Sequence, residues 1–349
     1  MKTIKISQKL IGGQEPCFII AEAGINHNGD INIAKKMIDS AIEAGVDAVK
    51  FQTFTAKEFI SNENEMHEYK SQGKIVKESA LKMFERNEFK EEEWKEIAEY
   101  CKQKGIIFFS TPQDLSNLEL LLRIEVPAIK VGSDDLVNLP LLEGYSKKGL
   151  PMIISTGMAY LLEIDEAVRT IKNNNDDLAI LHCISSYPAE FGELNLEKIK
   201  NLRNIFPDCV IGFSDHSEGA IAAIIAVALG AKIIEKHFTL DKSMPGSDHW
   251  FSADPEELKE LVKNIRSTEK ALGDSKIKPT DKEVETRKTA HRSITASQDI
   301  KKGEKLTEEN IAMKRPGTGI LSKFTPLIIG KEAREDIKKG ELISFDKIK

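Results

Sequence analysis

Short apolar runs alternate with longer amphipathic stretches from residue 18 to residue 273 of the chain. Each run is rich in Ile, Val and Phe and has the length of a buried parallel strand. The eight runs are residues 18–24 ("FIIAEAG"), 47–52, 106–111, 128–133, 151–157, 178–183, 210–216 and 232–238 ("KIIEKHF").

The stretches between these runs have the pattern of amphipathic helices. Residues 31–45 repeat apolar side chains at helical spacing and stop at Gly45, and residues 90–105 begin acidic, end basic and stop at Gly105. Residues 162–174 and 254–273 have the same character. Alternating strands and helices predict a parallel sheet with right-handed crossovers. Eight such units favour an α/β fold of the closed (β/α)₈ TIM-barrel type. The main alternative is an open doubly wound sheet, which a GxGxxG motif would favour, and the chain has none.

The pattern changes after Gly273. Residues 273–288 are polar and charged, which is typical of a linker. The segment "DIKKGEKLTEENI" (299–311) then returns as "DIKKGELISFDKI" (336–348). Two copies are too few for a solenoid, so they predict a compact β-rich domain folded around two related turns. The expected organisation is a barrel domain at 1–272, a linker at 273–288 and a small domain at 289–349, which we expect to dock on another surface because its core is small.

Composition limits the class of protein. The chain has 349 residues, of which 40% are hydrophobic and 30% are charged, as in an ordinary globular protein. The net charge of −6 argues against a nucleic-acid partner, which favours a basic protein. The N-terminus lacks the apolar core of a signal peptide, and the longest apolar run (220–231) is too short to span a bilayer. We therefore expect no membrane partner. The four cysteines show no CxxC spacing and predict reduced thiols in a cytoplasmic protein.

All eight apolar runs end in polar residues. In a (β/α)₈ barrel the carboxyl ends of the strands carry the chemistry, so these residues predict one lined pocket. The strand ends carry Glu22, Lys50, Gln52, Thr111, Lys130, Ser133, Asp135, Ser155, Thr156, His182, Tyr187, Ser214, Asp215, His216, Glu235 and His237.

Lys50 and Lys130 each interrupt an apolar run. A buried ammonium group is costly unless an anion meets it. That anion is either a protein carboxylate such as Glu22 or a phosphate or carboxylate of the substrate. We favour the substrate, because hydroxyl and amide donors follow on neighbouring strands. A Schiff-base lysine is a third reading, since burial lowers the pKa of a lysine.

His216 and His237 end adjacent strands, so their imidazoles can converge. Two neutral imidazoles beside Asp215 and Glu235 suit a divalent metal such as Mn, Fe, Co or Zn. General acid–base catalysis by the two histidines is the alternative, because the strand ends alone do not distinguish it from metal binding. We take His67, His249 and His291 as structural residues.

Several motifs resemble the sialic acid synthase family, which comprises N-acetylneuraminate synthases and their legionaminate and pseudaminate relatives. These motifs are "IIAEAGINHNGD", "VKFQTF", "STP", "IKVGS", "ISTGM", "LHCISSYPA", "GFSDHSEG" and "IEKHFTLDKSMPGSDH". The segment "DIKKGE…KRPGTGI" resembles the antifreeze-like SAF domain, a β-clip fold, that follows the barrel in this family. The resemblance runs from about residue 18 to the end.

The resemblance implies an enzyme that condenses phosphoenolpyruvate with an open-chain N-acyl-mannosamine-type aldehyde and water. The products are a nine-carbon 2-keto acid and phosphate. His216 and His237 match the family's ligands for Mn²⁺ or Mg²⁺. Glu22 matches a carboxylate beside the metal and the amino sugar, which we interpret as a base or a water-orienting group. Arg315 matches an arginine that the SAF domain inserts into the partner's active site, which implies a domain-swapped homodimer.

The resemblance also assigns the substrate contacts. Positions that hold phosphoenolpyruvate are matched by Lys50, Lys130, Thr111, Ser133, Ser155 and Ser214, with Thr156 as a further hydroxyl donor, and sugar-contacting positions by Gln52, Asp135, Tyr187 and Asp248. Asp134-Asp135 replaces a Gly-Glu pair of the family, and Gln113 replaces a Phe. Both differences concern the acceptor sugar. N-acetylmannosamine and 2,4-diacetamido sugars are therefore both kept as acceptors, and the "GSDH" segment leans toward the legionaminate type.

Two other functions are kept as alternatives. A Schiff-base aldolase could use Lys50 or Lys130. The C-terminal domain could instead bind ice or carbohydrate, with the barrel as a carrier, but its repeat is too densely charged for an ice-binding face.

Overall fold

The structure, a computed structural model, describes residues 2–349 and comprises two compact units. The first unit ends at Gly273, and the second runs from Asp274 to Lys349. Each unit has its own hydrophobic core.

The first unit is a closed barrel of eight parallel strands, in the order β10-β11-β12-β3-β4-β7-β8-β9. The predicted TIM barrel is therefore confirmed. The strands are β3 (Phe18–Gly24), β4 (Ala48–Thr53), β7 (Ile107–Pro112), β8 (Ile129–Val131), β9 (Met152–Ser155), β10 (Leu178–Cys183), β11 (Val210–Asp215) and β12 (Ile233–His237). These strands are almost wholly buried because helices cover their outer face, which explains why they read as continuous apolar runs.

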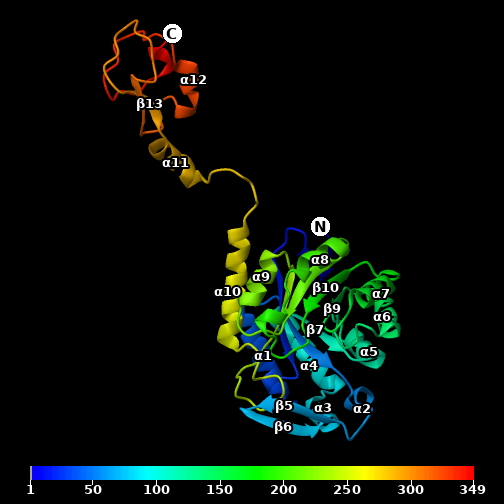
Figure 1. The fold of residues 1–349 in the computed structure, drawn as a ribbon. Helices are drawn as coiled ribbons and strands as arrows, with labels where there is room; N and C mark the ends of the chain where they lie inside the picture. The colour runs from blue at the N-terminus through cyan, green and yellow to red at the C-terminus, as the bar shows by residue number, and fades with distance from the viewer. Residues whose placement is uncertain (1) are drawn as a thin grey trace. The chain divides into compact units, whose positions relative to one another are not determined.

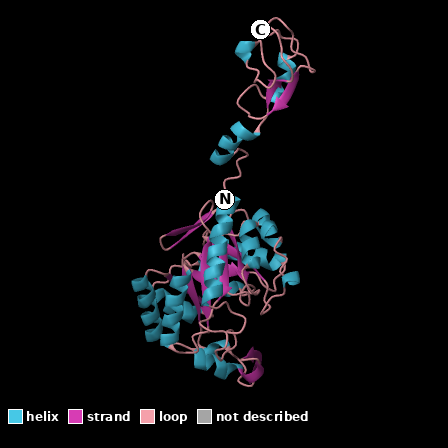
Figure 2. Ribbon diagram, turned by 90° about the vertical axis from the view of Figure 1, so that its left-hand side faces the viewer, coloured by secondary structure: helices cyan, strands magenta, loops and turns pink. Residues whose placement is uncertain are grey.

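Helices surround this sheet on the outside (Figure 2). They are α1 (Ile31–Ala44), α4 (Glu91–Lys104), α5 (Leu115–Arg123), α6 (Leu139–Ser146), α7 (Leu161–Lys172), α8 (Lys198–Ile205), α9 (Ile221–Ala228) and α10 (Pro255–Leu272), with a short 3₁₀ helix η1 (Phe191–Glu193) before α8. The first of them shows how the sequence sets its bounds. The Asp30 side chain accepts a hydrogen bond from the Asn32 amide and caps α1, and Gly45 ends it with a left-handed φ of 82°.

Two antiparallel hairpins lie at opposite ends of the barrel (Figure 1). The N-terminal hairpin pairs β1 (Thr3–Ile6) with β2 (Lys9–Gly12) and buries Ile4, Ile6 and Ile11. The second hairpin pairs β5 (Met66–Ser71) with β6 (Lys74–Ser79), flanked by α2 (Ala56–Phe59) and α3 (Ala80–Asn87). Its residues are mostly exposed, so no apolar alternation marked it in the sequence.

The second unit contains α11 (Asp281–Ala290), β13 (Ser293–Ala296), β14 (Ile311–Lys314), η2 (Ser322–Phe324), α12 (Thr325–Ile328) and η3 (Phe345–Lys347). Helix α11 begins inside the segment 273–288 that we predicted as a linker and ends beyond it, at Ala290. A reciprocal capping box between Thr280 and Glu283 explains its start. Most of its core side chains are isoleucines from β13, the two repeats and the final residues.

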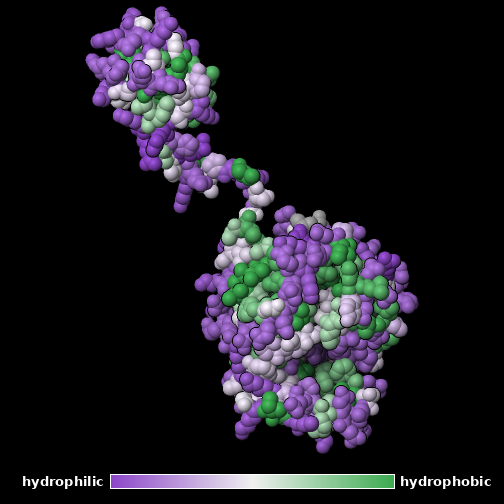
Figure 3. Space-filling view, viewed as in Figure 1, coloured by the Kyte–Doolittle hydropathy of each residue, from purple (hydrophilic) through white to green (hydrophobic). Residues whose placement is uncertain are grey.

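The two sequence repeats interlock in this unit. Ile300 and Ile337, one from each repeat, form an antiparallel bridge. The Asp299 carboxylate accepts hydrogen bonds from Lys338 Nζ (3.1 Å) and the Lys339 amide (2.9 Å). The Asp336 carboxylate accepts the same pair of bonds from the lysines of the first repeat, at 3.0 and 2.9 Å. The aspartate of each repeat therefore binds the lysines of the other. The face of the unit seen in Figure 3 is largely hydrophilic.

Two further facts bear on the sequence predictions. All four cysteines are free and buried. Within residues 2–349, every helix is too short or too polar to cross a lipid bilayer.

Candidate active site

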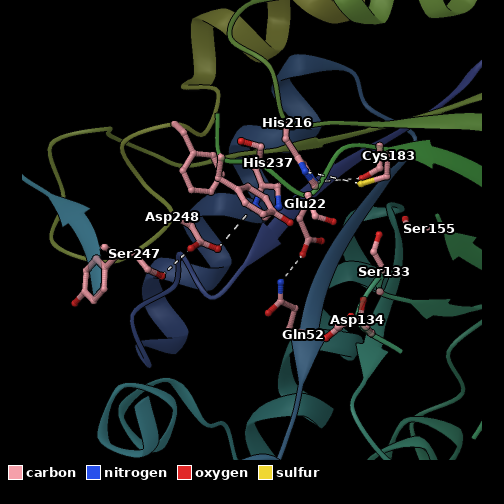
Figure 4. A pocket seen from close by; sticks show the side chains of 18 of the residues that line it. Glu22, Gln52, Ser133, Asp134, Ser155, Cys183, His216, His237, Ser247 and Asp248 are labelled. Atoms are coloured by element: carbon pink, nitrogen blue, oxygen red, sulfur yellow. Dashed lines mark hydrogen bonds and ion pairs between the residues drawn. The ribbon is translucent and has the colours of Figure 1, made fainter. Parts of the chain in front are cut away.

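A cavity of about 800 Å³ is lined by side chains from the carboxyl ends of all eight barrel strands and from the loops that follow them (Figure 4). Most of the site residues predicted from the sequence line this one cavity: Glu22, Lys50, Gln52, Thr111, Lys130, Ser133, Ser155, Tyr187, Ser214, His216, His237 and Asp248. The lining side chains form three groups: an inner group of lysines and carboxylates, a histidine pair, and a group that faces the opening.

The inner end holds two buried lysines and two buried carboxylates. Lys50 Nζ lies 2.6 Å from Glu22 Oε2 and 3.7 Å from Glu235 Oε2. Lys130 Nζ lies 3.7 Å from the other oxygen of Glu235. The lysines also donate to hydroxyls, Lys50 to Thr111 (3.1 Å) and Lys130 to Ser155 (2.7 Å). The pairing of Lys50 with Glu22, which we had weighed against a substrate anion, is thus present.

Glu235, which we expected at a strand end beside the histidine pair, belongs to this inner group. It is 5% exposed and bridges the two lysines, and the Ser214 hydroxyl donates to it at 2.9 Å.

The charges of this group are shifted by burial and by each other. Burial raises the pKa of Glu22, and the neighbouring Glu235 adds to this while Lys50 opposes it. Burial works against the Glu235 carboxylate as well, but Lys130 and Lys50 hold its pKa below the usual value. Burial lowers the pKa of Lys130, whereas Glu22 and Glu235 outweigh burial at Lys50 and raise its pKa. Lys130 is therefore the lysine whose ammonium group is less fully compensated.

Hydroxyls and an amide form a cradle beside Lys130. Ser133 Oγ accepts a hydrogen bond from the Gly157 amide at 2.9 Å. A Cβ atom on Gly157 would overlap the hydroxyls of Ser185 and Ser133, so the close approach requires glycine. Hydroxyls, a backbone N–H and an ammonium group together suit an anion such as phosphate or carboxylate.

The second group is a pair of histidines. The rings of His216 and His237 lie 5.3 Å apart between centroids. His216 Nδ1 lies 2.7 Å from the carbonyl oxygen of Ile184, which assigns the ring proton to Nδ1. Nε2, which lies 3.5 Å from Ser214 Oγ, then carries an electron pair. His237 Nδ1 is buried without a hydrogen-bond partner and lies 3.9 Å from Asp248 Oδ2.

These two imidazoles carry different proton affinities. Burial lowers the pKa of His237 well below its usual value, and a charge on His216 lowers it further. Burial also opposes the charge of His216, but the Cys183 sulfur at 3.9 Å and the Ile184 carbonyl outweigh it and raise the pKa of His216. His237 is therefore neutral at physiological pH, as a metal ligand must be.

Asp215, which we expected beside the histidine pair, points away from it. Its carboxylate lies 2.9 Å from Lys236 Nζ and also accepts bonds from the amide and hydroxyl of Ser217. The ion pair of Asp215 and Lys236 is buried and links β11 to β12. Within residues 2–349, no three or more His, Cys, Asp or Glu side chains are grouped so as to hold a metal ion by themselves.

The third group faces the opening. Gln52 donates to Glu22 Oε1 at 3.1 Å, and Ser247 donates to Asp248 at 2.7 Å. Gly24 lies between them, since a Cβ on it would lie 3.4 Å from Glu22 and Gln52 and 3.7 Å from Asp248. Figure 4 shows these side chains converging below the histidine pair. Burial raises the pKa of Asp248.

An outer wall of the cavity was absent from the sequence prediction. It consists of the β5–β6 hairpin and aromatic side chains from α2, α3 and the loop after β12, namely His67, Glu68, Tyr69, Lys70, Ile75, Phe59, Phe84, Trp250 and Phe251. The Lys70 ammonium lies over the Trp250 ring, 4.6 Å from its centroid. His67, which we took as structural, thus lines the cavity, whereas His249 is buried in a hydrogen-bond network.

Four side chains that we predicted at strand ends do not line the cavity, namely Asp135, Thr156, His182 and Asp215. His182 Nε2 lies 2.7 Å from the Leu194 carbonyl oxygen, and Asp215 pairs with Lys236. Thr156 donates its hydroxyl to the Leu181 carbonyl (3.0 Å). Asp135 accepts from the Asn138 amide group (3.1 Å), and its neighbour Asp134 lines the cavity instead. Arg315 belongs to the second unit, where its exposed side chain donates from Nε to the Ala290 carbonyl (3.0 Å).

Comparison with known proteins agrees with this arrangement. The model of the NeuB family matches residues 37–277, and the SAF domain model matches residues 291–349. The N,N'-diacetyllegionaminic acid synthase of Legionella pneumophila is 39% identical over 342 residues, covering 97% of this chain and 96% of that protein. Human N-acetylneuraminate-9-phosphate synthase is also 39% identical, over 87% of this chain and 84% of the human protein.

A solved structure shows the same fold. The N-acetylneuraminic acid synthetase of Leptospira borgpetersenii, crystallised with citrate, has a TM-score of 0.74 and 38% sequence identity, covering 82% of this chain and 95% of that one. The fold and the site define a TIM-barrel protein whose cavity holds two buried lysines, with an attached SAF domain. The chain belongs to the NeuB family.

Proposed function

We propose that this chain is a phosphoenolpyruvate-dependent nonulosonic acid synthase. It condenses phosphoenolpyruvate with the aldehyde form of an N-acyl amino sugar and water, and releases phosphate. The acceptor we propose first is N-acetylmannosamine, which gives N-acetylneuraminate. One observation supports this most: a single cavity combines two buried lysines, a histidine pair and a group of sugar-type hydrogen-bonding side chains.

Phosphoenolpyruvate would bind at the inner end. Its phosphate and carboxylate carry several negative charges, which the Lys50 and Lys130 ammonium groups can meet. Thr111, Ser133, Ser155 and Ser214 add hydroxyl donors around the same volume. Because these donors come from five different strands of a rigid barrel, they are positioned before the substrate arrives.

The histidine pair fits a divalent cation, and we propose Mn²⁺ or Mg²⁺. The orphaned Nδ1 of His237 and Nε2 of His216, which lies 3.5 Å from Ser214 Oγ, are the electron-pair donors of this pair. With only these two protein ligands, oxygen atoms of the substrate and water would complete the shell. When bound, the cation would supply Lewis-acid polarisation of the aldehyde carbonyl.

Side chains near the opening would orient the acceptor. Carbon 3 of phosphoenolpyruvate forms the new bond to the aldehyde carbon, water adds at carbon 2, and the bond to phosphate breaks. Glu22, whose pKa is raised by burial, is placed to take a proton from that water or to orient it. Gln52, Tyr187 and Asp248 would bind the hydroxyl and amide groups of the sugar.

A 2,4-diacetamido sugar is the second acceptor we consider, and it would give a legionaminate- or pseudaminate-type product. The aromatic outer wall favours it, because Phe59, Phe84 and Trp250 offer apolar surface to an additional acyl group. The Legionella relative is named for such a product.

We also propose a domain-swapped homodimer in the cytoplasm, in which Arg315 enters the active site of the partner subunit. Arg315→Ala should then lose most activity while Mn²⁺ binding persists. Mixing this variant with a barrel-inactive variant such as Lys50→Met should restore activity, because some hybrid sites would contain both residues. Mixtures that stay as inactive as the separate variants would refute the swap.

The direct test follows phosphate release from phosphoenolpyruvate with Mn²⁺ and each acceptor in turn. Release that requires an acceptor supports the proposal, and inertness with N-acetylmannosamine and the 2,4-diacetamido sugars rejects it. Borohydride with pyruvate tests the Schiff-base alternative, since an aldolase would be covalently inactivated and a synthase would not.

A further inference from the structure

The loop between β12 and α10, residues 238–254, carries Asp248, Trp250 and Phe251 into the cavity. We call it the acceptor loop. It is irregular except for a parallel bridge between Phe238 and Ala253 at its base. Because an irregular loop has no sheet to fix its course, other contacts must hold Asp248 in position.

Hydrogen bonds tie this loop to the turn after β3, from an exposed edge at Pro245 inward to the buried His249. Asn28 Nδ2 donates to the Pro245 carbonyl at 2.9 Å, and Asn28 Oδ1 lies 3.3 Å from His249 Nε2. On its other side His249 Nδ1 lies 2.6 Å from Thr239 Oγ1. Asn28 itself has a φ of 52°, a left-handed conformation that asparagine tolerates better than most residues.

A second turn residue holds the loop just beyond Asp248. Asn26 Nδ2 donates to Ser252 Oγ (3.0 Å) and to the Phe238 carbonyl (2.9 Å). Ser252 Oγ in turn donates to the Asp248 carbonyl at 2.6 Å. The backbone of Asp248 is therefore fixed from both sides of the residue.

His249 is suited to hold the acceptor loop in place and is not suited to transfer protons. It is 1% exposed, and burial lowers its pKa to about 4, so it is neutral at physiological pH. A neutral imidazole donates from one nitrogen and accepts at the other. The assignment that satisfies both neighbours has Nε2–H donating to Asn28 and Nδ1 accepting from Thr239. Gly246 is needed here, since its φ is 149° and a Cβ would strike the His249 ring.

The β5–β6 hairpin holds the outer side of the same loop. The Gly246 amide donates to Ser71 Oγ at 3.1 Å, and Gln72 Nε2 donates to the Ser243 carbonyl at 3.0 Å. One of these bonds is partly buried and the other is exposed, as for the two bonds of Asn28, and they hold the loop from its outer side.

We propose that Asn28 and His249 are positioning residues that hold Asp248 at the acceptor end of the cavity. This inference rests on the proposed function. Since His249 is anchored inside the protein, the preceding Asp248 side chain is directed the other way, toward His237 and Gly24. Neither Asn28 nor His249 contacts Lys50, Lys130 or the cradle of hydroxyls and an amide beside Lys130. Their loss should therefore change acceptor binding and leave phosphoenolpyruvate binding intact.

The test compares Michaelis constants for both substrates in Asn28→Ala and in wild type. Loss of two hydrogen bonds should raise the acceptor KM about tenfold or more, with the phosphoenolpyruvate KM changed less than about twofold. Asn28→Asp keeps an oxygen for His249 but loses the donor to Pro245, so its acceptor KM should lie between the two. Asn264→Ala, which removes an exposed amide on α10, is the matched control and should leave both constants unchanged.

A double variant separates positioning from general damage. In an Asp248→Ala background, Asn28→Ala should raise the acceptor KM no further, because the side chain it positions is gone. An additive effect, equal effects on both substrates, or an unchanged acceptor KM would overturn the proposal. If Asn28→Ala fails to fold, His249→Gln and Ser71→Ala are read in the same way, with Ser71→Ala giving the smaller effect. A wild-type protein inert with every acceptor would instead reject the proposed function.

Discussion

Replacing Lys236 by Met should destabilise the barrel strongly, although Lys236 lies outside the cavity. Lys236 and Asp215 are 3% and 0% exposed and face each other across the β11–β12 pair. Their charged atoms lie 2.9 Å apart, and Lys236 also donates to the Ser217 carbonyl. Met fills a similar volume, so the substitution removes the charge and leaves the packing nearly intact.

The size of the effect follows from what remains buried. Without the ammonium group, Asp215 keeps only its two bonds from Ser217 and becomes an uncompensated buried carboxylate. Breaking a buried pair in this way costs about 3–5 kcal/mol. At roughly 2 °C per kcal/mol for a domain of this size, the midpoint of thermal unfolding should fall by about 6–10 °C.

Thermal unfolding followed by far-ultraviolet circular dichroism measures this change. Lys242→Met is the matched control, because Lys242 pairs with Glu257 at 2.6 Å but both side chains are 38% exposed, and such pairs contribute less than about 1 kcal/mol. Asp215→Asn combined with Lys236→Met should recover part of the loss, since the buried charge is then absent. A Lys236→Met midpoint as close to wild type as that of Lys242→Met would refute the reasoning.

Three further predictions concern the cavity. Gly157→Ala should raise the KM for phosphoenolpyruvate at least about tenfold with little change for the acceptor, because the new methyl group enters the hydroxyl cradle; equal changes for both substrates would contradict the cradle. His216→Ala and His237→Ala should each abolish Mn²⁺ binding measured by calorimetry while the circular dichroism spectrum is retained, and wild-type affinity in either variant would exclude that histidine as a ligand. The KM for phosphoenolpyruvate should rise on the alkaline side at a pH below 10.5, because burial lowers the pKa of Lys130 and its ammonium group is lost earlier than that of an exposed lysine. Lys130→Arg keeps its charge and should remove this rise. Identical pH profiles in the two proteins would assign the rise to another group.

The barrel was predictable because a buried parallel strand leaves a continuous apolar run, and each of the eight runs overlaps one strand of the barrel. The exact ends were less predictable. Strand β8 covers only Ile129–Val131 of the predicted 128–133, because Gly132 and Ser133 turn away to build the cradle. The β5–β6 hairpin left no apolar signal, since its side chains serve the rim of the cavity and solvent instead of a core.

The direction of each side chain at a strand end was the part of the site that the sequence analysis treated incorrectly. Side chains alternate along a strand, so Ser214 and His216 face the cavity while Asp215 faces the outside. The same alternation turns Thr156 away from the cavity, between Ser155 and Gly157. It also places Glu235 inside with His237, where it meets the two lysines. Applying the two-residue period to the last residues of each run would have excluded Asp215 and Thr156 from the cavity.

The charges at the inner end connect the separate proposals. Lys50 and Lys130 are balanced by Glu22 and Glu235, so the four side chains together bring no net positive charge to an anion. Phosphoenolpyruvate carries more negative charge than a neutral pocket would hold away from water. The compensation must come from groups outside this quartet, and the two candidates are a divalent cation at the histidine pair and the guanidinium of Arg315. Under the proposed function, phosphoenolpyruvate would bind tightly only with both groups in place, which would couple its binding to assembly of the complete site.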